Sequence, residues 1–450
     1  MGNYLSVPSI TKSTDSGANE QVFYSLVAMQ GWRIAMEDAH AVVLDLEAAN
    51  GKLNSFFAVY DGHGGSSVAK FAGLNVHKRL VTEEAYKNDN YEEALKNAFL
   101  GTDEDILAEP TQTSKSSESG CTAVAALLTY DNKIYVANAG DSRSVLGVKG
   151  QAEPLSFDHK PENVDERARI RSAGGYLERN RVNGNLALSR ALGDFQFKKN
   201  SSLGPQAQII TANPDVTCHE IMEDDEFFVL ACDGIWDCLG SQDVVDFVRY
   251  QVSKGKELTE IGGMICDHCL APDTRDEGIG CDNMTILIVA IKHGRSKKKW
   301  YAWIKDRVKK KYGYETPSTP PQLYTQSRLN AFRANKEKYE IANREREEKA
   351  AAAERNASTS VRSTPSSTQA GSQNAQNDLS EGSASEDELP ENELSEDELP
   401  PEAEPKTIAG WLAIKWKDVF RRIFIFLRPL FPREFLVQLR TNLSQLFFHT

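Results

Sequence analysis

Short apolar runs alternate with turn residues between residues 21 and 291 of this 450-residue chain. Five runs have the length and composition of β-strands: Phe56–Tyr60, Ala123–Leu128, Ile134–Asn138, Phe227–Cys232 and Met284–Ile291. Helices are predicted between them: Ser66–Val81, Tyr91–Ala108, Val164–Ala173 and Gln242–Val252. Short strands mixed with helices predict an α+β fold, in which layered sheets are covered by helices, rather than one parallel doubly wound sheet.

Two local features refine these elements. Ser241 directly precedes the last helix and is its expected N-cap. The run Ile134–Asn138 is followed by Ala-Gly-Asp-Ser and then by the run Arg143–Val148, which predicts a strand, a turn and a returning strand. In the simplest interpretation, Asp141 is the tip of this hairpin.

The composition changes three times after residue 292. Residues 293–355 are highly charged and predict a helical extension; ten basic residues and one acid lie between Lys292 and Lys311. Residues 356–405 are rich in Ser, Thr, Pro, Gln and Glu and predict a disordered acidic linker, because they bury too little apolar surface to offset the entropy of ordering. Residues 406–450 form a basic amphipathic tail.

The net charge of −13 is unevenly distributed. Residues 378–404 carry twelve acidic side chains and no Lys or Arg, so the other residues together carry −1. A nearly neutral body does not favour nucleic acid as a partner.

Cysteine usage and hydropathy indicate the compartment. The seven cysteines are odd in number and scattered, which predicts reduced thiols in an intracellular protein. Cys266 and Cys269 form a lone C-x-x-C without a second ligand pair, so two helical thiols are favoured over a zinc site. We expect no secretory leader and no membrane span, since no stretch approaches the roughly 20 apolar residues that a spanning helix needs.

Three acidic residues stand at the ends of predicted strands. Asp61 and Asp233 each directly follow a strand, and Asp282 stands two residues before one. If that last strand is antiparallel to the others, the three carboxylates collect at one edge of the sheet. Taken singly, each is more often a turn residue. Together they would repel one another unless a divalent cation held them, and oxygen ligands favour Mg²⁺ or Mn²⁺ over zinc.

The segment Trp32–Asp38 adds a guanidinium and two further carboxylates. In an extended segment Arg33 and Glu37 share one face, separated by about 13 Å of backbone. Arg33 could then reach a phosphate beside metal ions that Glu37 supports through water; the alternative is an ordinary surface ion pair. With a nearby histidine, the set suits hydrolysis of a phosphate ester by a metal-activated water.

Eight short motifs follow one another in an order typical of one enzyme family. They are Trp32–Asp38, Val59–Gly65, Ser119–Ala123, Asn138–Arg143, Asp158–Pro161, Leu188–Asp194, Ala231–Asp237 and Gly280–Thr285. On these motifs the chain resembles the metal-dependent serine/threonine protein phosphatases of the PPM family, type 2C, in particular their fungal and animal branch. The resemblance covers residues 21–292 and continues more weakly through Arg328. It implies a four-layer αββα sandwich of two packed antiparallel sheets flanked by helices, here followed by the helical extension and the disordered tail.

The resemblance also implies a set of metal ligands. Asp61 would bridge two Mn²⁺ or Mg²⁺ ions, the carbonyl of Gly62 would bind one of them, and Asp233 and Asp282 would complete the other. Two further pairs of carboxylates match the family: Asp141 and Asp237 at a third, weaker metal, and Glu37 and Asp38 holding metal-bound waters.

Two side chains would act directly on the substrate if the resemblance holds. Arg33 would bind the phosphoryl oxygens, for which its planar fork is suited. His63 would act as the general acid that protonates the leaving oxygen. The segment Val164–Asn183 would be a flap beside the site that shapes substrate choice.

The resemblance predicts a protein serine/threonine phosphatase that hydrolyses its substrate without a phosphoenzyme. Expected substrates are phosphorylated proteins, in particular signalling kinases of stress and cell-cycle pathways. One alternative is a phosphoprotein-binding scaffold, which missing ligands would indicate, although all are present. The other is a different two-metal hydrolase such as a nuclease, which would need a basic groove.

The two ends of the chain suggest regulation. Gly2 stands in a myristoylation pattern, and one acyl chain needs a second membrane signal such as the amphipathic tail 406–450. The tail could instead dock on the body or be an unusual chain end. Ser385 and Ser395 each precede Glu-Asp-Glu and predict phosphorylation and a phosphopeptide-reading partner. The basic stretch Lys297–Lys311 is either a nuclear import signal or a solvated helix face. We therefore expect a cytoplasmic and nuclear protein with peripheral membrane contact.

Overall fold

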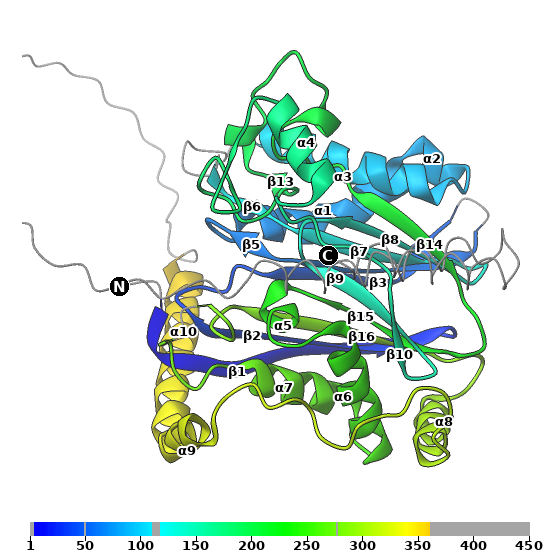
Figure 1. Cartoon of the computed structure of the whole chain (residues 1–450), viewed down its shortest axis with the longest axis vertical. Helices are drawn as coiled ribbons and strands as arrows, with labels where there is room; N and C mark the ends of the chain where they lie inside the picture. The colour runs from blue at the N-terminus through cyan, green and yellow to red at the C-terminus, as the bar shows by residue number, and fades with distance from the viewer. Residues whose placement is uncertain (1–3, 49–50, 110–117, 276–277, 361–450) are drawn as a thin grey trace, which may run out of the picture. The chain divides into compact units, whose positions relative to one another are not determined.

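The computed structural model describes residues 4–48, 51–109, 118–275 and 278–360. Two large antiparallel sheets lie face to face (Figure 1). The six-stranded sheet has the order β1 (Tyr4–Ala18), β2 (Val22–Arg33), β16 (Met284–Ile291), β15 (Asp225–Ala231), β9 (Arg143–Val148) and β10 (Gln151–Pro154). The five-stranded sheet has the order β14 (Asp215–Glu220), β8 (Lys133–Ala139), β7 (Ala123–Leu128), β4 (Leu53–Tyr60) and β3 (Ala39–Glu47).

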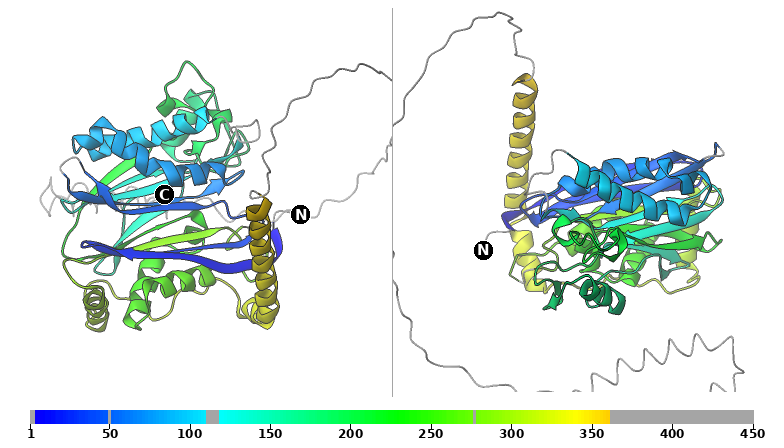
Figure 2. Two further views of the ribbon diagram at one scale, coloured as in Figure 1. Left: turned by 180° about the vertical axis from the view of Figure 1, so that it is seen from behind. Right: turned by 90° about the horizontal axis from the view of Figure 1, so that it is seen from above.

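Helices cover the outer face of each sheet (Figures 1 and 2). The five-stranded sheet is covered by α1 (Ser67–Thr82), α2 (Glu84–Lys87) and α3 (Tyr91–Ala108). The six-stranded sheet is covered by α6 (Ser241–Ser253), α7 (Leu258–Cys269) and α8 (Lys297–Lys309). The predicted four-layer sandwich of two antiparallel sheets flanked by helices is thus confirmed.

The apolar runs of the central strands are continuous because these strands are buried on both faces. In β4, Phe56 and Ala58 face the helices, whereas Phe57 and Val59 face the other sheet. Residues alternate between the two faces of a strand, so a strand buried on both sides has no polar positions. The same alternation divides β15, where Phe228 packs between the sheets and the residues on either side face α6 and α7.

The predicted hairpin at residues 134–148 is wrong. β8 pairs with β7 and β14 in the five-stranded sheet, whereas β9 pairs with β10 and β15 in the six-stranded sheet. The turn between them therefore crosses from one sheet to the other. Local sequence cannot distinguish this crossing from a hairpin, because both need only a turn between two apolar runs. The crossing places Asp141 between the sheets.

The N-cap of α6 also differs from the prediction. The helix begins at Ser241, and Gly240 is the capping residue. The side chain of Asp243 accepts a hydrogen bond from the backbone N–H of Gly240 at 3.0 Å. The hydroxyl of Ser241 instead accepts a hydrogen bond from Arg143 at 3.1 Å. The side chain that the sequence predicted to cap the helix therefore makes a tertiary contact.

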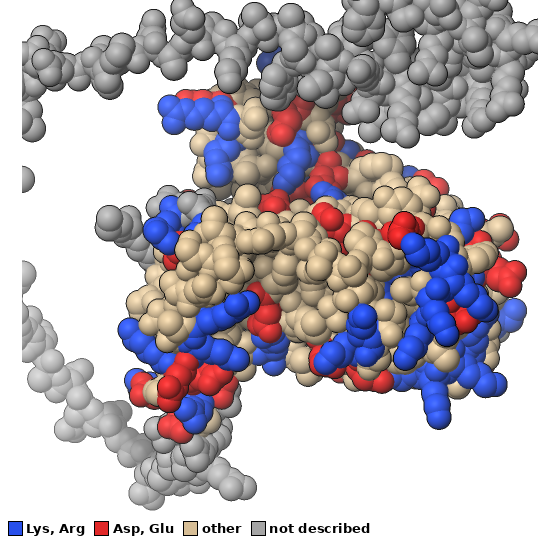
Figure 3. Space-filling model, turned by 60° about the horizontal axis from the view of Figure 1, so that its bottom comes forward, with Lys and Arg blue, Asp and Glu red and all other residues tan. Residues whose placement is uncertain are grey.

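Segments at both ends of the chain pack on the six-stranded sheet. Residues 4–18, which precede the part of the chain that the resemblance covers, form its edge strand β1. In the predicted extension, Trp300 and Ile304 of α8 are fully buried in the core. The lysines of α8 are exposed, and Figure 3 shows Lys and Arg gathered over this helix at the right of the molecule.

The extension continues in α9 (Gln326–Ala334) and α10 (Lys336–Ser360), which lie at the end of the sheet where β1 begins (Figures 1 and 2). α10 reaches five residues into the predicted linker, whose remainder lies outside the described residues. Among the helices that the structure describes, none has the length and apolarity needed to cross a bilayer.

Candidate metal centre and active site

The three carboxylates at strand ends come from both large sheets. Asp61 directly follows β4, whereas Asp233 begins α5 (Asp233–Trp236) after β15, and Asp282 precedes β16. β15 and β16 are antiparallel, so Asp233 and Asp282 lie at the same end of their sheet. The expected single sheet edge is therefore a junction of two sheets, because β4 belongs to the opposite sheet.

These carboxylates raise one another's pKa values. Burial raises the pKa of Asp61 well above its usual range, and the charges of Asp233, Asp38 and Asp282 raise it further. The pKa of Asp233 is also raised well above its usual range, first by burial and then by Asp141 and Asp282. A divalent cation would neutralise this repulsion and let all the carboxylates ionise at neutral pH.

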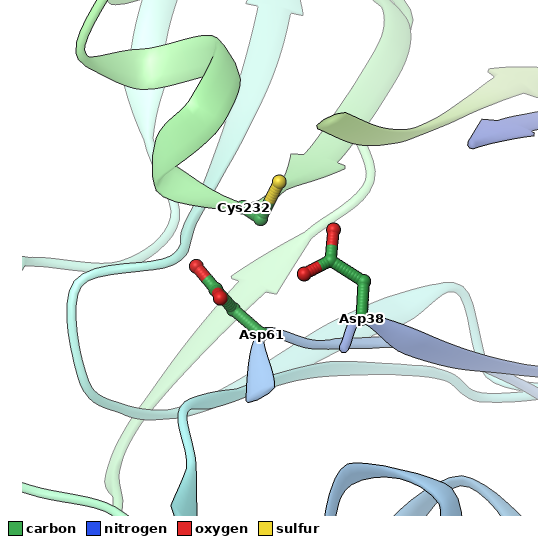
Figure 4. A group of neighbouring side chains, drawn as sticks. All are labelled: Asp38, Asp61 and Cys232. Atoms are coloured by element: carbon green, nitrogen blue, oxygen red, sulfur yellow. The ribbon is translucent and has the colours of Figure 1, made fainter. Parts of the chain in front are cut away.

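Asp38, Asp61 and Cys232 converge from three strand ends (Figure 4). One ligand atom from each lies within 4.8 Å of the other two. Oδ2 of Asp38 accepts a hydrogen bond from Thr285 at 2.6 Å, whereas its buried Oδ1 has no hydrogen-bond partner. Burial raises the pKa of Asp38 to about 6. An unpartnered carboxylate oxygen in this cluster suits a metal-bound water or a metal ion.

The thiol of Cys232 contributes structure to this group. Its Sγ contacts the carbonyl of Asn283 at 3.5 Å and accepts a hydrogen bond from the backbone N–H of Thr285 at 3.1 Å. Burial raises the pKa of this thiol well above its usual range, so it stays protonated. A neutral thiol is a poor ligand, and the remaining donors are oxygens, the set that Mg²⁺ and Mn²⁺ prefer. The residues present therefore fit a hard divalent metal.

Gly62 lies where no side chain could be accommodated. A Cβ on this residue would stand 2.3 Å from the backbone oxygen of Glu37. Glu37 is fixed in turn, since its N–H donates to the side-chain oxygen of Asn283 at 2.8 Å. The side-chain amide of Asn283 also donates to the carbonyls of Gln30 and Ala35. Asn283 thus ties the segment after β2 to the strand that follows Asp282.

Arg33 is the last residue of β2 and forms an ion pair with Asp282. The structure therefore places the predicted phosphate-binding side chain directly against a predicted metal ligand. The Arg33 side chain is 42% exposed, so part of the guanidinium remains open to solvent. The alternative, an ion pair, is thus seen as well, but its partner is a residue of the carboxylate cluster and not Glu37.

His63 lies in the short strand β5 (Gly62–His63) and is oriented by an acidic residue. Its Nε2 lies 2.7 Å from Oδ2 of Asp194, which is 1% exposed. Burial disfavours the imidazolium, but the hydrogen bond and the charge of Asp194 outweigh this and raise the pKa of His63. A Cβ on Gly120 would meet both groups, at 2.3 Å from Asp194 and 2.7 Å from His63. Glycine is therefore required beside this pair.

The predicted third-metal residues differ in exposure, since Asp141 is buried and Asp237 is exposed. Nζ of Lys160 donates to Oδ2 of the buried Asp141 at 2.5 Å. Asp237 is exposed and lies one helical turn after Asp233. The ammonium of Lys160 partly neutralises this pair in the structure, so a third cation would have to compete with it.

The predicted flap, Val164–Asn183, consists of α4 (Val164–Ser172) and a small hairpin of β11 (Leu177–Glu178) and β12 (Arg181–Val182). Its own small core includes Ile170 and Val182. The flap is joined to the body by Glu166 of α4, which forms ion pairs with Arg169 and with Arg190.

Some predicted residues are not part of this site. Cys266 and Cys269 lie buried in α7 as free thiols, as the helical interpretation expected. Gly2, Ser385, Ser395 and the tail 406–450 lie outside the described residues.

Three site residues were not assigned a role from sequence: Asp194, Lys160 and Asn283. Each lies inside one of the eight motifs, so their positions were visible. Their partners were not, because the hydrogen bonds join residues 131, 19 and 246 positions apart. A polar residue inside a recognised motif but without an assigned role is the signal that the sequence offers for such residues.

Comparisons with known proteins agree with this geometry. The family model described as "Protein phosphatase 2C" matches residues 23–278. The chain is 50% identical over 347 residues to "Protein phosphatase 2C homolog 2" of Aspergillus fumigatus, covering 74% of this chain and 79% of that protein. It is 51% identical over 323 residues to "Protein phosphatase 2C homolog 3" of Schizosaccharomyces pombe, covering 72% and 76%.

A solved phosphatase from Toxoplasma gondii shares the fold. Its TM-score is 0.53 at 24% sequence identity, and the match covers 62% of this chain and 95% of that one. The sandwich, the acidic centre and these matches define a protein-serine/threonine phosphatase. The chain belongs to the protein phosphatase 2C family, as the order of its motifs predicted.

Proposed function

We propose that this protein hydrolyses phosphoserine and phosphothreonine with the help of two Mn²⁺ or Mg²⁺ ions and without a phosphoenzyme. The observation that carries the proposal is the convergence of Asp38, Asp61, Asp233 and Asp282, where burial first and then mutual repulsion raise the pKa of Asp61 well above its usual range. Protein cations compensate this repulsion only in part, through Arg33 and Lys160. The arrangement therefore has the charge balance of a metal centre.

The chemistry of the donors suggests which residues would hold the ions: the carboxylates of Asp61, Asp233 and Asp282 and the carbonyl of Gly62. The carboxylates of Glu37 and Asp38 would orient waters, and Asp141 and Asp237 would hold a third, weaker ion. When bound, the ions supply Lewis acidity, which lowers the pKa of an attacking water and stabilises charge on the phosphoryl group.

Arg33 and His63 would act on the two sides of the phosphorus atom. Once Asp282 binds a cation, the guanidinium of Arg33 is free to hold two phosphoryl oxygens in its planar fork. His63 would donate a proton to the leaving serine or threonine oxygen. Since Nε2 already bonds to Asp194, that proton must be carried by Nδ1.

Substrates and location are inferred from the resemblance and from the chain ends. We propose that phosphorylated signalling kinases are among the substrates, in the cytoplasm and nucleus. The exposed lysines of α8 support a nuclear import signal. Acylation at Gly2, membrane contact by residues 406–450, and a phosphopeptide reader at Ser385 and Ser395 are further proposals, supported by their sequence patterns.

Hydrolysis of a phosphothreonine peptide by the full chain tests the proposal. We expect turnover with Mn²⁺, none with chelator, and a loss of at least about a thousandfold in Asp233→Ala, because one ion loses its carboxylate. Asp243→Ala, an acidic residue of α6 outside the site, should retain turnover. Turnover that survives chelation would exclude the metal mechanism. Phosphopeptide binding without turnover under any condition would favour the scaffold.

A further inference from the structure

The last described helix contacts the first described strand. α10 packs along the outer edge of β1, although more than 330 residues separate the partners. Neither the N-terminal strand nor this helix has a role in the chemistry proposed above. Figures 1 and 2 show α10 crossing the end of the sheet where β1 begins.

Side chains of α10 form hydrogen bonds with backbone groups of β1, as the backbone of a further strand would. Asn343, which is 5% exposed, accepts a hydrogen bond from the N–H of Ile10 at 3.3 Å and donates to the carbonyl of Pro8 at 3.1 Å. Arg346 donates to the carbonyl of Val7 at 2.9 Å. An edge strand offers such groups to a neighbouring strand, and here side chains of a helix satisfy them.

This part of β1 is weakly held by its own sheet. From Lys12 to Ala18 every residue has a partner on β2, but between Tyr4 and Thr11 only Tyr4 and Ser9 do. The ladder is irregular on both sides of Ser9. Where β-pairing is interrupted, fewer backbone hydrogen bonds fix the chain, so contacts from outside the sheet determine its position.

Tyr4, at the end of this segment, lies beside the predicted phosphate-binding residue. It pairs with Arg33 in the ladder, and its ring centre is 6.0 Å from the guanidinium carbon. The ring also packs against the core under α7, which limits its movement. Arg33 is thus flanked by Asp282 and by the Tyr4 ring. When Asp282 binds a cation, the aromatic ring remains to restrict the guanidinium.

We propose that α10 is a positioning element for the phosphate site: by holding residues 7–11 it keeps Tyr4 against Arg33 and so sets the affinity for the phosphoryl group. Tyr4 and Asn343 are positioning residues, since both act through Arg33. The inference rests on the phosphate-binding role proposed for Arg33. Its physical basis is pre-organisation, because a long side chain that is already restricted loses less entropy when it binds.

Inorganic phosphate, a product inhibitor, is the probe. Its inhibition constant and the kcat and KM for p-nitrophenyl phosphate are measured with the full Mn²⁺-loaded chain. We expect Asn343→Ala and Tyr4→Ala each to raise the inhibition constant and KM about two- to fivefold, with kcat changed by less than about twofold. This fold-change corresponds to the free energy of a partly exposed cation–π contact. Tyr4→Phe should rescue the affinity. Glu345→Ala, an exposed residue on the side of α10 away from β1, should match the unmodified chain.

The double variant Tyr4→Ala/Asn343→Ala should be no weaker than Tyr4→Ala alone, since both changes act through one contact. Hydrogen exchange of residues 4–11 should rise in Asn343→Ala because the strand end is released, whereas the exchange of α10 should not change.

Arg33→Ala separates this inference from the phosphate-binding role proposed for Arg33. If it raises the inhibition constant and Tyr4→Ala and Asn343→Ala do not, the inference is wrong and the role of Arg33 stands. If Arg33→Ala changes nothing, the role of Arg33 fails and the inference with it.

Discussion

Glu166 shows how a buried carboxylate is kept ionised in this protein. It is 3% exposed, and burial alone would raise its pKa. Arg190 and Arg169 together with the hydroxyl of Ser189 reverse the effect and lower the pKa of Glu166 to about 2. Asp61 is shifted in the opposite direction because its neighbours are carboxylates. Between these two buried carboxylates, the charge of the neighbours therefore decides the direction of the shift.

The stability of the flap should depend on pH through Glu166. Its folded pKa lies below the unfolded value of about 4.5, so it stabilises the protein above pH 4.5 and loses this contribution as the pH falls toward 2. Glu166→Gln should be destabilised by a few kcal/mol at pH 7, and the difference should shrink between pH 5 and pH 3. Urea unfolding at several pH values measures this. A difference that is independent of pH would contradict the assignment.

At the scale of elements, close packing of α7 on the sheet depends on one glycine. A Cβ on Gly262 would lie 2.7 Å from Cγ2 of Val27 in β2. Gly262 is buried, and Ile261 and Ile265 of the same helix belong to the core. The neighbouring Gly263 faces outward, where a Cβ would meet only the side chain of Lys12 at 3.4 Å. A side chain is therefore excluded at Gly262 but could be accommodated at the adjacent Gly263.

Substituting these two glycines by alanine should have opposite effects. Gly262→Ala should lower the free energy of unfolding by about 1–3 kcal/mol, because the added methyl forces α7 away from β2. Gly263→Ala should raise it by about 0.5–1 kcal/mol, because alanine reduces the entropy of the unfolded chain without a clash. Thermal and urea unfolding compare the two variants. Equal destabilisation by both would show that helix geometry, not contact with Val27, limits this position.

At the scale of the molecule, a buried ionic cluster joins the predicted extension to the phosphatase sheet. Glu226 of β15 is fully buried and forms ion pairs with Arg249 of α6 and Arg307 of α8. Arg307 also pairs with Asp224 at 2.8 Å. Trp300 adds a hydrogen bond to the backbone oxygen of Glu226. We therefore expect α8 to unfold together with the sheet, although sequence placed it beyond the catalytic domain.

Removing the cation of α8 tests this coupling. Arg307→Met should lower the free energy of unfolding by about 3 kcal/mol, because it leaves the buried carboxylate of Glu226 with one cation fewer. Activity and tryptophan fluorescence should be lost at the same urea concentration. Lys305→Met, an exposed lysine of the same helix, is the matched control and should change stability by less than about 0.5 kcal/mol. Early loss of fluorescence with activity retained would show that α8 is an independent element.

The sequence by itself determined the family and several of the central elements, although it did not predict strands such as β2 and β3. Runs such as Ala123–Leu128 and Met284–Ile291 were readable with their exact bounds, because strands buried on both faces leave no polar positions. Helix α3 was equally clear from its periodicity. The motifs indicated the phosphatase family because most of them place chemically specific residues next to a strand end, and such spacing is local.

Only the tertiary structure decided which strands share a sheet and which side chains meet. The turn before Arg143 resembles a hairpin but crosses between sheets, and Asp61 meets Asp233 across that boundary. The pairing of His63 with Asp194, and of α10 with β1, joins segments that local patterns treat independently. Hydrophobic periodicity fixes which face of an element is buried. The partner of that face is fixed by the packing of the whole chain, because burial is non-directional and many partners satisfy it equally.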